Sequence, residues 1–209
     1  MRSVAFRHDA DVLRAAEAAA EVRAASGTIL IPTETFYGLA ADPSDSVAVG
    51  RIAEAKGRPP EMAVPVLVAD WQQLESLVLV PERYRVRLSR IWPAALTVIL
   101  RTHAEVAAGR EGTLAVRIPG HAMLRALLYR IGPLTGTSAN RHGRPPTMSV
   151  ADALASLANP PDLVLDGGPT SGGLPSTLVD LTADEPHVLR RGEVPWRDDF
   201  PWDDPLATG

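Results

Sequence analysis

The chain has 209 residues, a formal net charge of −4 and 45% hydrophobic residues, so it can bury the core of one large domain and is not a disordered chain. It contains no cysteine, which excludes disulfides and thiolate chemistry. The negative charge argues against general adhesion to nucleic acid but leaves a local basic groove open. No apolar run approaches the roughly 20 residues of a membrane helix, and residues 1–6 lack a signal core, so we expect a cytoplasmic protein without a membrane segment.

The first half of the chain alternates short apolar runs with amphipathic segments. Asp9 is expected to cap a helix that Gly27 ends, and Pro32 is expected to stop the strand that follows. Asp70 and Pro81 mark the starts of two later helices. The expected strands cover residues 3–6, 28–31 and 64–68, a loop covers 32–39, and the expected helices cover 10–25, 46–55, 71–77 and 81–92.

The second half mixes strands and helices in the same way. Strands are expected over residues 96–101, 113–118, 162–165, 176–181 and 187–190, and helices over 120–131 and 149–158. A short strand leads into a polar loop at residues 135–147, and a glycine-rich loop covers 167–173. This order predicts an α/β or α+β protein with a mixed sheet.

The domain organisation is expected to be simple. Residues 1–192 are interpreted as one domain, and residues 193–209 as a loosely attached acidic tail with three Pro, two Trp and five Asp or Glu. The alternative is that Trp196 or Trp202 docks on the core.

Several familiar site types are missing from the sequence. It has no G-x-x-x-x-G-K-[ST], no G-x-G-x-x-G and no G-x-S-x-G, and its five His have no metal-ligand spacing. Covalent and metal-centred mechanisms are therefore poorly supported.

The remaining candidates are cationic and hydroxyl residues beside Pro or Gly. Lys56 and Arg58 follow a helix, where they either offset the helix dipole or bind an anion. Arg117 stands in an apolar strand and needs an anionic partner, which is either a protein carboxylate or a ligand carboxylate held by both arms of the guanidinium. Ser138 and Asn140 can supply neutral donors to phosphate. Together these residues suit nucleotidyl transfer from ATP, which needs positioning and charge neutralisation.

Seven motifs then identify a family. They are residues 32–38 (PTETFYG), 56–59 (KGRP), 91–97 (IWPAALT), 114–117 (LAVR), 137–140 (TSAN), 175–180 (PSTLVD) and 188–192 (VLRRG). In this order they resemble the YrdC/TsaC family, the threonylcarbamoyl-AMP synthases, over about residues 10–192. The resemblance implies a short single-domain form with a twisted, mostly mixed open sheet and flanking helices around a concave, positively lined cavity.

The resemblance also implies an activity. It implies a nucleotidyltransferase that converts L-threonine, bicarbonate or CO2 and ATP into threonylcarbamoyl-adenylate and pyrophosphate. That product feeds the threonylcarbamoyl modification of the adenosine beside the anticodon of tRNAs that read codons beginning with A. Mg2+ is expected with ATP, the tRNA threonylcarbamoyl transferase complex is an expected partner, and no stable binding of nucleic acid is expected.

The site residues implied by the resemblance form two groups. The ATP contacts are Lys56, Arg58, Thr113, Ser138, Asn140 and Arg190, of which Lys56 and Arg58 are the catalytic pair. The threonine contacts are Thr33, Arg117 and Ser176, with Arg117 on the carboxylate. No protein ligand for a metal is expected.

The sequence departs from the family pattern in two places. Gly136 stands where many members have Ser or Thr, and Met62 and Ala63 replace a polar residue and a Pro. Two alternatives therefore stay open. One is a family paralogue with another substrate, and the other is an RNA-binding module, which the acidic charge and scarce aromatic residues disfavour.

Overall fold

The computed structural model describes residues 1–59 and 62–196, and within them the chain forms six helices and twelve strands. The helices are α1 (Asp11–Ala24), α2 (Ser46–Lys56), α3 (Trp71–Leu77), α4 (Glu82–Ile91), α5 (Ala122–Ile131) and α6 (Val150–Ser156). The strands are β1 (Arg2–Ala5), β2 (Ile29–Pro32), β3 (Tyr37–Ala40), β4 (Val66–Leu67), β5 (Val78–Leu79), β6 (Leu96–Thr102), β7 (Thr113–Arg117), β8 (Leu134–Thr135), β9 (Thr137–Ser138), β10 (Leu163–Asp166), β11 (Thr177–Asp180) and β12 (His187–Arg190).

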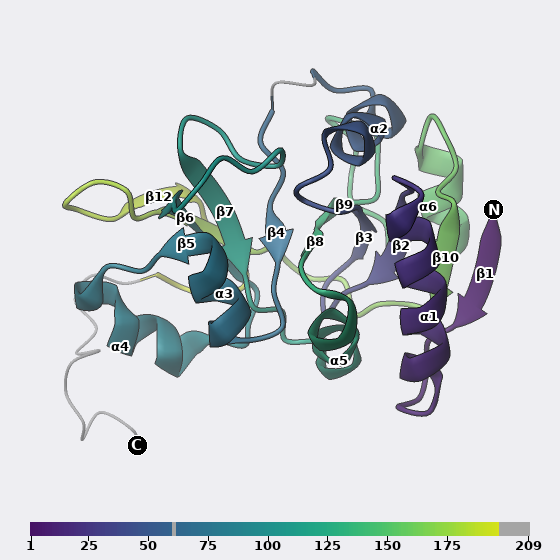
Figure 1. The fold of residues 1–209 in the computed structure, drawn as a ribbon, viewed down its shortest axis with the longest axis horizontal. Helices are drawn as coiled ribbons and strands as arrows, with labels where there is room; N and C mark the ends of the chain where they lie inside the picture. The colour runs from purple at the N-terminus through teal and green to yellow at the C-terminus, as the bar shows by residue number, and fades with distance from the viewer. Residues whose placement is uncertain (60–61, 197–209) are drawn as a thin grey trace.

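The strands divide between two mixed sheets that stand side by side (Figure 1). The first sheet has the order β1-β10-β2-β3-β9, with β10 parallel to both β1 and β2 and the other pairs antiparallel. The second has the order β12-β11-β6-β7-β4-β8, and β5 pairs with β6. In it the pairs β11–β6 and β4–β7 are parallel. The expected class, a mixed α/β protein with an open sheet, is confirmed, and the division into two sheets is new.

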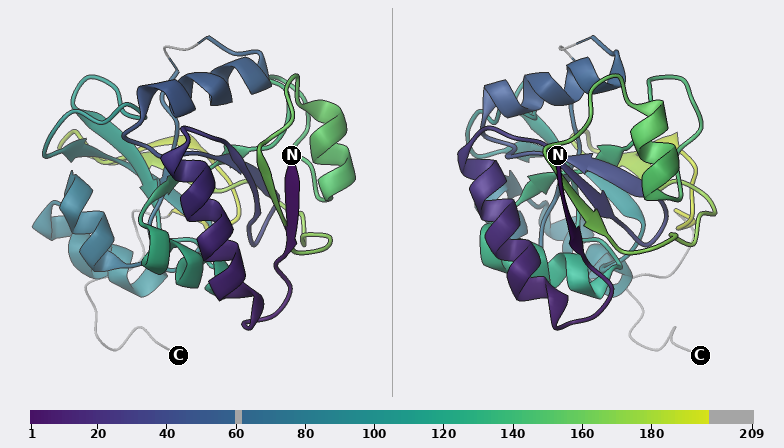
Figure 2. Two further views of the ribbon diagram at one scale, coloured as in Figure 1. Left: turned by 45° about the vertical axis from the view of Figure 1, so that its right-hand side comes forward. Right: turned by 90° about the vertical axis from the view of Figure 1, so that its right-hand side faces the viewer.

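Helices cover both faces of the first sheet. Ile29 and Ile31 point to the core under α1 and α5, while Leu30 between them points to the core under α2 and α6. Side chains alternate across a strand, so the unbroken apolar run of β2 is that of a strand buried on both faces. Figure 2 shows α6 on the opposite side of these strands from α1.

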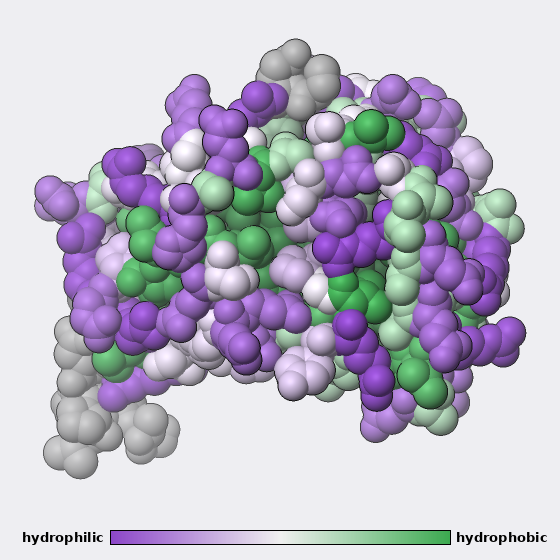
Figure 3. All heavy atoms as spheres, viewed as in Figure 1, coloured by the Kyte–Doolittle hydropathy of each residue, from purple (hydrophilic) through white to green (hydrophobic). Residues whose placement is uncertain are grey.

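Within the described residues, helices cover one face of the second sheet. Its core contains Leu74 of α3 and Leu88 of α4 together with Val98, Leu114 and Val116 of the sheet. The other face carries Thr97 and Arg117, and it turns toward the first sheet. The outer surface in the view of Figure 3 is mostly hydrophilic, with smaller apolar areas between the polar side chains.

Most of the expected elements are present within one to three residues of their predicted ends. Asp70 caps α3 as expected, since its carboxylate accepts the Gln73 backbone N–H at 2.9 Å. Asp9 does not cap α1, because the helix begins after Ala10 and has no side-chain cap. Asp11 instead accepts the backbone N–H groups of the preceding turn.

Two short strands lie where loops were expected. β3 falls partly within the expected loop at residues 32–39, and β9 falls within the expected loop at 135–147. Each is held by its neighbours, since β3 pairs with β2 and β9 pairs with β3. Two- and four-residue strands that contain Gly or small polar residues give weak local signals, so pairing across the sheet decides their conformation.

The beginning of the expected tail lies against the domain. Trp196 is buried in the core of the second sheet, with its ring edge-on to Tyr84 and with Arg87 over its face. The alternative that Trp196 docks is therefore confirmed. Trp202 and the rest of residues 197–209 lie outside the described residues, and the boundary after residue 192 stays a prediction.

Trp196 is expected to contribute to stability. Trp196→Ala removes a large buried ring, and we expect the free energy of unfolding to fall by about 3 kcal/mol. Urea unfolding of this variant beside Leu189→Ala, a truncation of a half-exposed side chain, measures the difference. Equal stability of the two variants would contradict the docking of Trp196.

Candidate functional site

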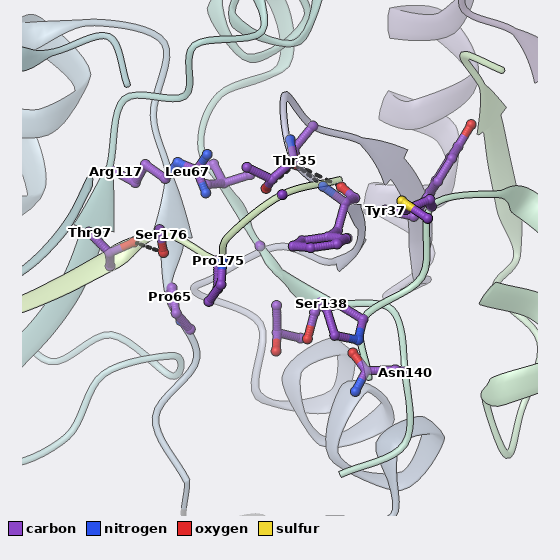
Figure 4. Close-up of a pocket in the computed structure, with 18 of the residues that line it drawn as sticks. Thr35, Tyr37, Pro65, Leu67, Thr97, Arg117, Ser138, Asn140, Pro175 and Ser176 are labelled. Carbon is purple, nitrogen blue, oxygen red and sulfur yellow. Dashed lines mark hydrogen bonds between the residues drawn. The ribbon is translucent and has the colours of Figure 1, made fainter. Parts of the chain in front are cut away.

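A cavity of about 660 Å³ lies between the two sheets. The first sheet contributes the turn before β3, the start of β3, and β9, while the second contributes side chains of β4, β6, β7 and β12 and of the segment before β11. Figure 4 shows the lining side chains, with Arg117 and Ser176 on one side and Ser138 and Asn140 on the other. Six of the nine expected site residues line it: Thr33, Arg117, Ser138, Asn140, Ser176 and Arg190.

Arg117 reaches the cavity because side chains alternate along β7. Val116 faces the core, so Arg117 faces the opposite side. Its Nη2 lies 2.5 Å from Glu34 Oε1, and its Nε donates to the Ala94 carbonyl at 3.2 Å. Of the two partners that the sequence left open, the protein carboxylate is therefore present, and Glu34 supplies it.

Glu34 is held in place for this ion pair. Its Oε1 also accepts the Gly120 backbone N–H at 2.6 Å. Burial favours the neutral form of Glu34, but the charge and hydrogen bond of Arg117 and the Gly120 N–H outweigh burial, so the pKa of Glu34 lies below its ordinary value. Glu34 is not among the lining residues of the cavity. It therefore fixes the Arg117 side chain from behind and leaves part of the guanidinium at the cavity wall.

Ser176 connects Arg190 to the same side of the cavity. The Ser176 hydroxyl is hydrogen-bonded to the Thr97 hydroxyl at 2.9 Å and accepts from Arg190 Nη2 at 3.1 Å (Figure 4 shows the former). Arg190 Nε donates to the Ser176 carbonyl at 3.0 Å. Burial, and after it the charge of Arg117, lowers the pKa of Arg190. Two guanidinium groups therefore stand close together, an arrangement that an anionic ligand would relieve.

The turn before β3 places two hydroxyls at the cavity. Thr33 Oγ1 donates to the Phe36 carbonyl at 2.7 Å and accepts the N–H groups of Thr35 and Phe36 at 3.2 Å. The Thr33 hydroxyl therefore serves chiefly to form the turn. The Thr35 hydroxyl lies 3.3 Å from it and also lines the cavity.

The opposite side of the cavity is formed by β9 and the residues after it. Ser138 is exposed, so its hydroxyl is available to a ligand. Asn140 differs from the expectation that it donates to phosphate: its Nδ2 already donates to the carbonyls of Arg141 and Arg144 at 2.9 and 2.6 Å. Its buried Oδ1 has no partner within residues 1–59 and 62–196. The free group of Asn140 is thus an acceptor.

Lys56 lies directly behind this segment. Its Nζ donates to the carbonyls of Ser138 and of Asn140, the latter at 2.8 Å. Burial, and after it the charge of Arg58, lowers the pKa of Lys56 to about 8. Gly57 follows in a left-handed conformation and ends α2, which turns the chain so that Arg58 stands next to Lys56.

Arg58 is also buried. Burial lowers its pKa, and its Nε has no hydrogen-bond partner among the residues that the structure describes. Neither Lys56 nor Arg58 is a lining residue of the cavity. Lys56 contacts the Ser138 and Asn140 carbonyls, Arg58 adds its charge beside Lys56, and Lys56 has one N–H left for a ligand.

Thr113 is the one expected residue that the structure places elsewhere. It begins β7, whereas Arg117 ends it, so the two lie roughly 13 Å apart along the strand. Its hydroxyl donates to the Arg110 carbonyl at 2.7 Å and lines a separate small pocket of about 200 Å³. An ATP contact of Thr113 is therefore not supported by this structure.

Gly136 is the point where the chain passes from one sheet to the other. It stands between β8 of the second sheet and β9 of the first, and its N–H donates to the Pro65 carbonyl at 2.7 Å. Its φ is not in the left-handed region. A Cβ at this position would lie 2.5 Å from Leu67 Cδ1 and 3.0 Å from Cδ2, so Leu67 occupies the space of a side chain there.

Sequence reasoning assigned no role to several residues of the site. Thr35, Thr97 and Arg144 line the cavity, and Glu34 pairs with Arg117. Glu34 had a signal, because a charge in an apolar strand needs a counter-charge and residues 32–38 hold an acid. No sequence signal pointed to Thr97 or Arg144. The position of Thr97 depends on the register of the second sheet, and that of Arg144 depends on the path of the loop after β9.

The chemistry of the cavity follows from these groups. Cationic side chains and hydroxyls line it together with apolar side chains such as Phe36, Leu67 and Met148. Within residues 1–59 and 62–196 no three His, Cys, Asp or Glu come together as a metal site. None of the helices in the described part of the chain has the length and apolar character to cross a membrane. The fold and site thus define an α/β protein with a cavity between two sheets, in which three arginines and several hydroxyls suit an anionic small molecule.

Comparison with known proteins places this chain in a family. The Sua5_yciO_yrdC family model, described as "Telomere recombination", matches residues 21–192. The chain therefore belongs to the Sua5/YciO/YrdC family, as the motifs indicated. It is 36% identical to the threonylcarbamoyl-AMP synthase of Chromohalobacter salexigens over 85% of this chain and 97% of that protein. It is 38% identical to the threonylcarbamoyl-AMP synthase of Bacillus subtilis over 86% of this chain and 53% of that protein.

A solved structure is similar as well. The crystal structure of Sua5 from Pyrococcus abyssi complexed with L-threonine superposes with a TM-score of 0.79 and 33% sequence identity. The match covers 91% of this chain and 57% of that one, so this chain spans little more than half the length of the Pyrococcus protein.

Proposed function

We propose that this chain is a threonylcarbamoyl-AMP synthase, a nucleotidyltransferase that forms threonylcarbamoyl-AMP and pyrophosphate from L-threonine, bicarbonate and ATP. The observation that carries the proposal is the cavity, which brings Arg117 and Ser176 on one side opposite Ser138 and Asn140 on the other. Relatives that match most of this chain carry that name, and one related structure contains L-threonine.

The side of the cavity at Arg117 suits the amino acid. A guanidinium fixed by Glu34 offers paired donors to a carboxylate, and the Ser176 and Thr35 hydroxyls can bond to the remaining polar groups of threonine. Because Glu34 already fixes the side chain, little conformational freedom is lost when the ligand binds.

The side at Ser138 suits the nucleotide. Lys56 and Arg58 supply positive charge to the phosphates, the Ser138 hydroxyl can donate to them, and Asn140 Oδ1 can accept from a hydroxyl or amino group of the nucleoside. The amino group of threonine first forms a bond to the carbon of bicarbonate, with loss of water, to give a carbamate. In the transfer step an oxygen of this carbamate forms a bond to the α-phosphorus of ATP while the bond to pyrophosphate breaks. The chain holds the two reactants in one cavity and offsets the charge of the leaving group.

Mg2+ is proposed to arrive with ATP. Mg2+ favours carboxylate and phosphate oxygens, and among residues 1–59 and 62–196 no carboxylate lines the cavity. The site therefore fits a metal ion carried by the phosphates, whose charge that ion would help to neutralise. The same proposal includes a cytoplasmic setting and delivery of the product to a tRNA threonylcarbamoyl transferase complex.

Pyrophosphate release tests the proposal directly. We expect release that requires ATP, L-threonine and bicarbonate together and falls to background when any one is omitted. Formation of threonylcarbamoyl-AMP, detected by mass spectrometry, is the matching product measurement. Release that does not depend on threonine would exclude this activity.

The second candidate is a paralogue with another amino-acid or acyl substrate. It is favoured by Leu67, which fills the space at Gly136 with an apolar group. Calorimetric titration with threonine in the presence of ATP separates the two candidates. Submillimolar threonine binding supports the synthase, and absent threonine binding supports the paralogue.

A further inference from the structure

Leu67 is a buried side chain of the core under α1 and α5 that also reaches the wall of the cavity next to Arg117. β4 pairs with β7 in parallel, and Leu67 is the register partner of Arg117. Register partners point to the same face of a sheet, and both residues line the cavity (Figure 4). Pro65 precedes Leu67 by two residues and lines the cavity as well. A carboxylate-binding group and an apolar surface thus stand side by side.

The position of Leu67 depends on Gly136. The branched end of Leu67 fills the space that a Cβ at position 136 would need. Because the φ of Gly136 lies outside the left-handed region, an alanine there needs no strained φ, and the three atoms nearest to its Cβ all belong to Leu67. The two residues therefore act as one unit: Gly136 lets Leu67 lie back against β8 and β9, and a larger residue would push it toward the cavity.

We propose that the Leu67–Gly136 pair determines which amino-acid side chain the cavity accepts. The pair leaves room for one methyl group beyond the β-carbon of the amino acid. A ligand whose carboxylate lies on Arg117 has its own side chain within reach of Leu67. The proposal rests on the synthase function proposed above. It adds the identity of the residues that limit the size of the amino-acid side chain.

A series of three amino acids tests the pair. Serine, threonine and (2S,3R)-2-amino-3-hydroxypentanoic acid differ by one carbon at each step, and one carbon in an apolar pocket changes kcat/KM by roughly 10- to 200-fold. We expect the wild type to favour threonine over both neighbours by at least about tenfold. In Leu67→Ala we expect the preference over serine to fall to about twofold, and the five-carbon amino acid to become a substrate.

Gly136→Ala makes the space for the amino-acid side chain smaller, whereas Leu67→Ala makes it larger. Its Cβ displaces Leu67 into the cavity, and we expect the threonine efficiency to fall at least tenfold and the serine efficiency to fall less. In the double variant Leu67→Ala/Gly136→Ala the conflict is gone, so we expect threonine efficiency to recover above that of Gly136→Ala. Such recovery is the mark of two residues in direct contact.

A matched control separates specificity from general packing. Leu134 pairs with Leu67 on β8 and is fully buried, but it does not line the cavity. Leu134→Ala is expected to lower stability and to leave the ratio of threonine to serine unchanged. If Leu67→Ala does not fold, Leu67→Val removes one carbon and is expected to shift the same ratio in the same direction.

The outcomes are distinct from those of the proposed function. Wild-type pyrophosphate release that needs threonine, together with unchanged amino-acid ratios in the Leu67 and Gly136 variants, overturns the specificity pair and leaves the synthase intact. An equal change of the ratio in Leu134→Ala also overturns it. Wild-type release without any amino-acid requirement overturns the synthase and the pair together. Calorimetric binding of the three amino acids gives the same comparison without turnover.

Discussion

Arg117→Ala is expected to raise the threonine concentration needed for half-maximal rate by about 10- to 100-fold, while the ATP requirement changes much less. The physical reason is the loss of a charge-assisted contact to the carboxylate, worth about 1.5–3 kcal/mol. Steady-state pyrophosphate release at varied threonine and at varied ATP measures both requirements. A larger change in the ATP requirement would move Arg117 to the nucleotide side of the cavity.

The same substitution also affects the folded protein, since it leaves Glu34 without its partner. Glu34 keeps its backbone hydrogen bonds but loses the charge of Arg117, so we expect its pKa to rise and the free energy of unfolding to fall by about 2 kcal/mol. Arg117→Lys retains the charge and loses the paired geometry, and it should restore stability more than threonine use. Arg101→Ala is the matched control, because Arg101 is an exposed cation at the far end of the same strand pair.

Lys56→Met is expected to weaken nucleotide binding by about 10- to 100-fold. Lys56 holds the carbonyls of Ser138 and Asn140, so the variant loses a positive charge near the phosphates and also the support of the nucleotide side of the cavity. Calorimetric titration with ATP measures the affinity, and Lys56→Arg, which keeps the charge, serves as the comparison. An ATP affinity equal to that of the wild type in Lys56→Met would remove Lys56 from the site.

The pKa of Lys56 makes this prediction dependent on pH. The ammonium form binds phosphate, and in the free protein its pKa is about 8, so nucleotide affinity should fall as the pH rises above 8. Bound phosphates favour the ammonium and raise its pKa, and ATP binding near pH 9 should therefore take up a proton. Calorimetry in buffers of different ionisation enthalpy detects the uptake, which should be absent in Lys56→Met.

The low pKa of Lys56 should also make the free energy of unfolding depend on pH. Stability should rise over the pH range in which nucleotide affinity falls. The unfolded chain keeps the Lys56 proton up to about pH 10.5, whereas the folded chain releases it near pH 8. Between these values the unfolded state binds more protons, so stability rises with pH. Relative to Lys56→Met, the wild type should gain about 2 kcal/mol between pH 7.5 and 9.5 in urea unfolding. A gain of zero would mean that Lys56 has an ordinary pKa in the folded protein.

The sequence by itself determined the elements whose signals are local. Asp70 and Gly57 lie at helix ends and act there through their own side chain or backbone freedom. The sequence also showed that Arg117 is a charge in an apolar strand that needs an anionic partner, but it left open which partner. The ordered motifs indicated the family, and six of the nine expected site residues line one cavity.

Only the tertiary structure decided how these parts meet. It paired Arg117 with Glu34, turned the Asn140 nitrogen away from the cavity, and placed Thr113 at the far end of β7 from Arg117. It also made Gly136 the link between two sheets with Leu67 over it. These features depend on strand register and on contacts between residues far apart in the chain. A sequence pattern expresses the preference of each segment, whereas register is set when the segments pack together.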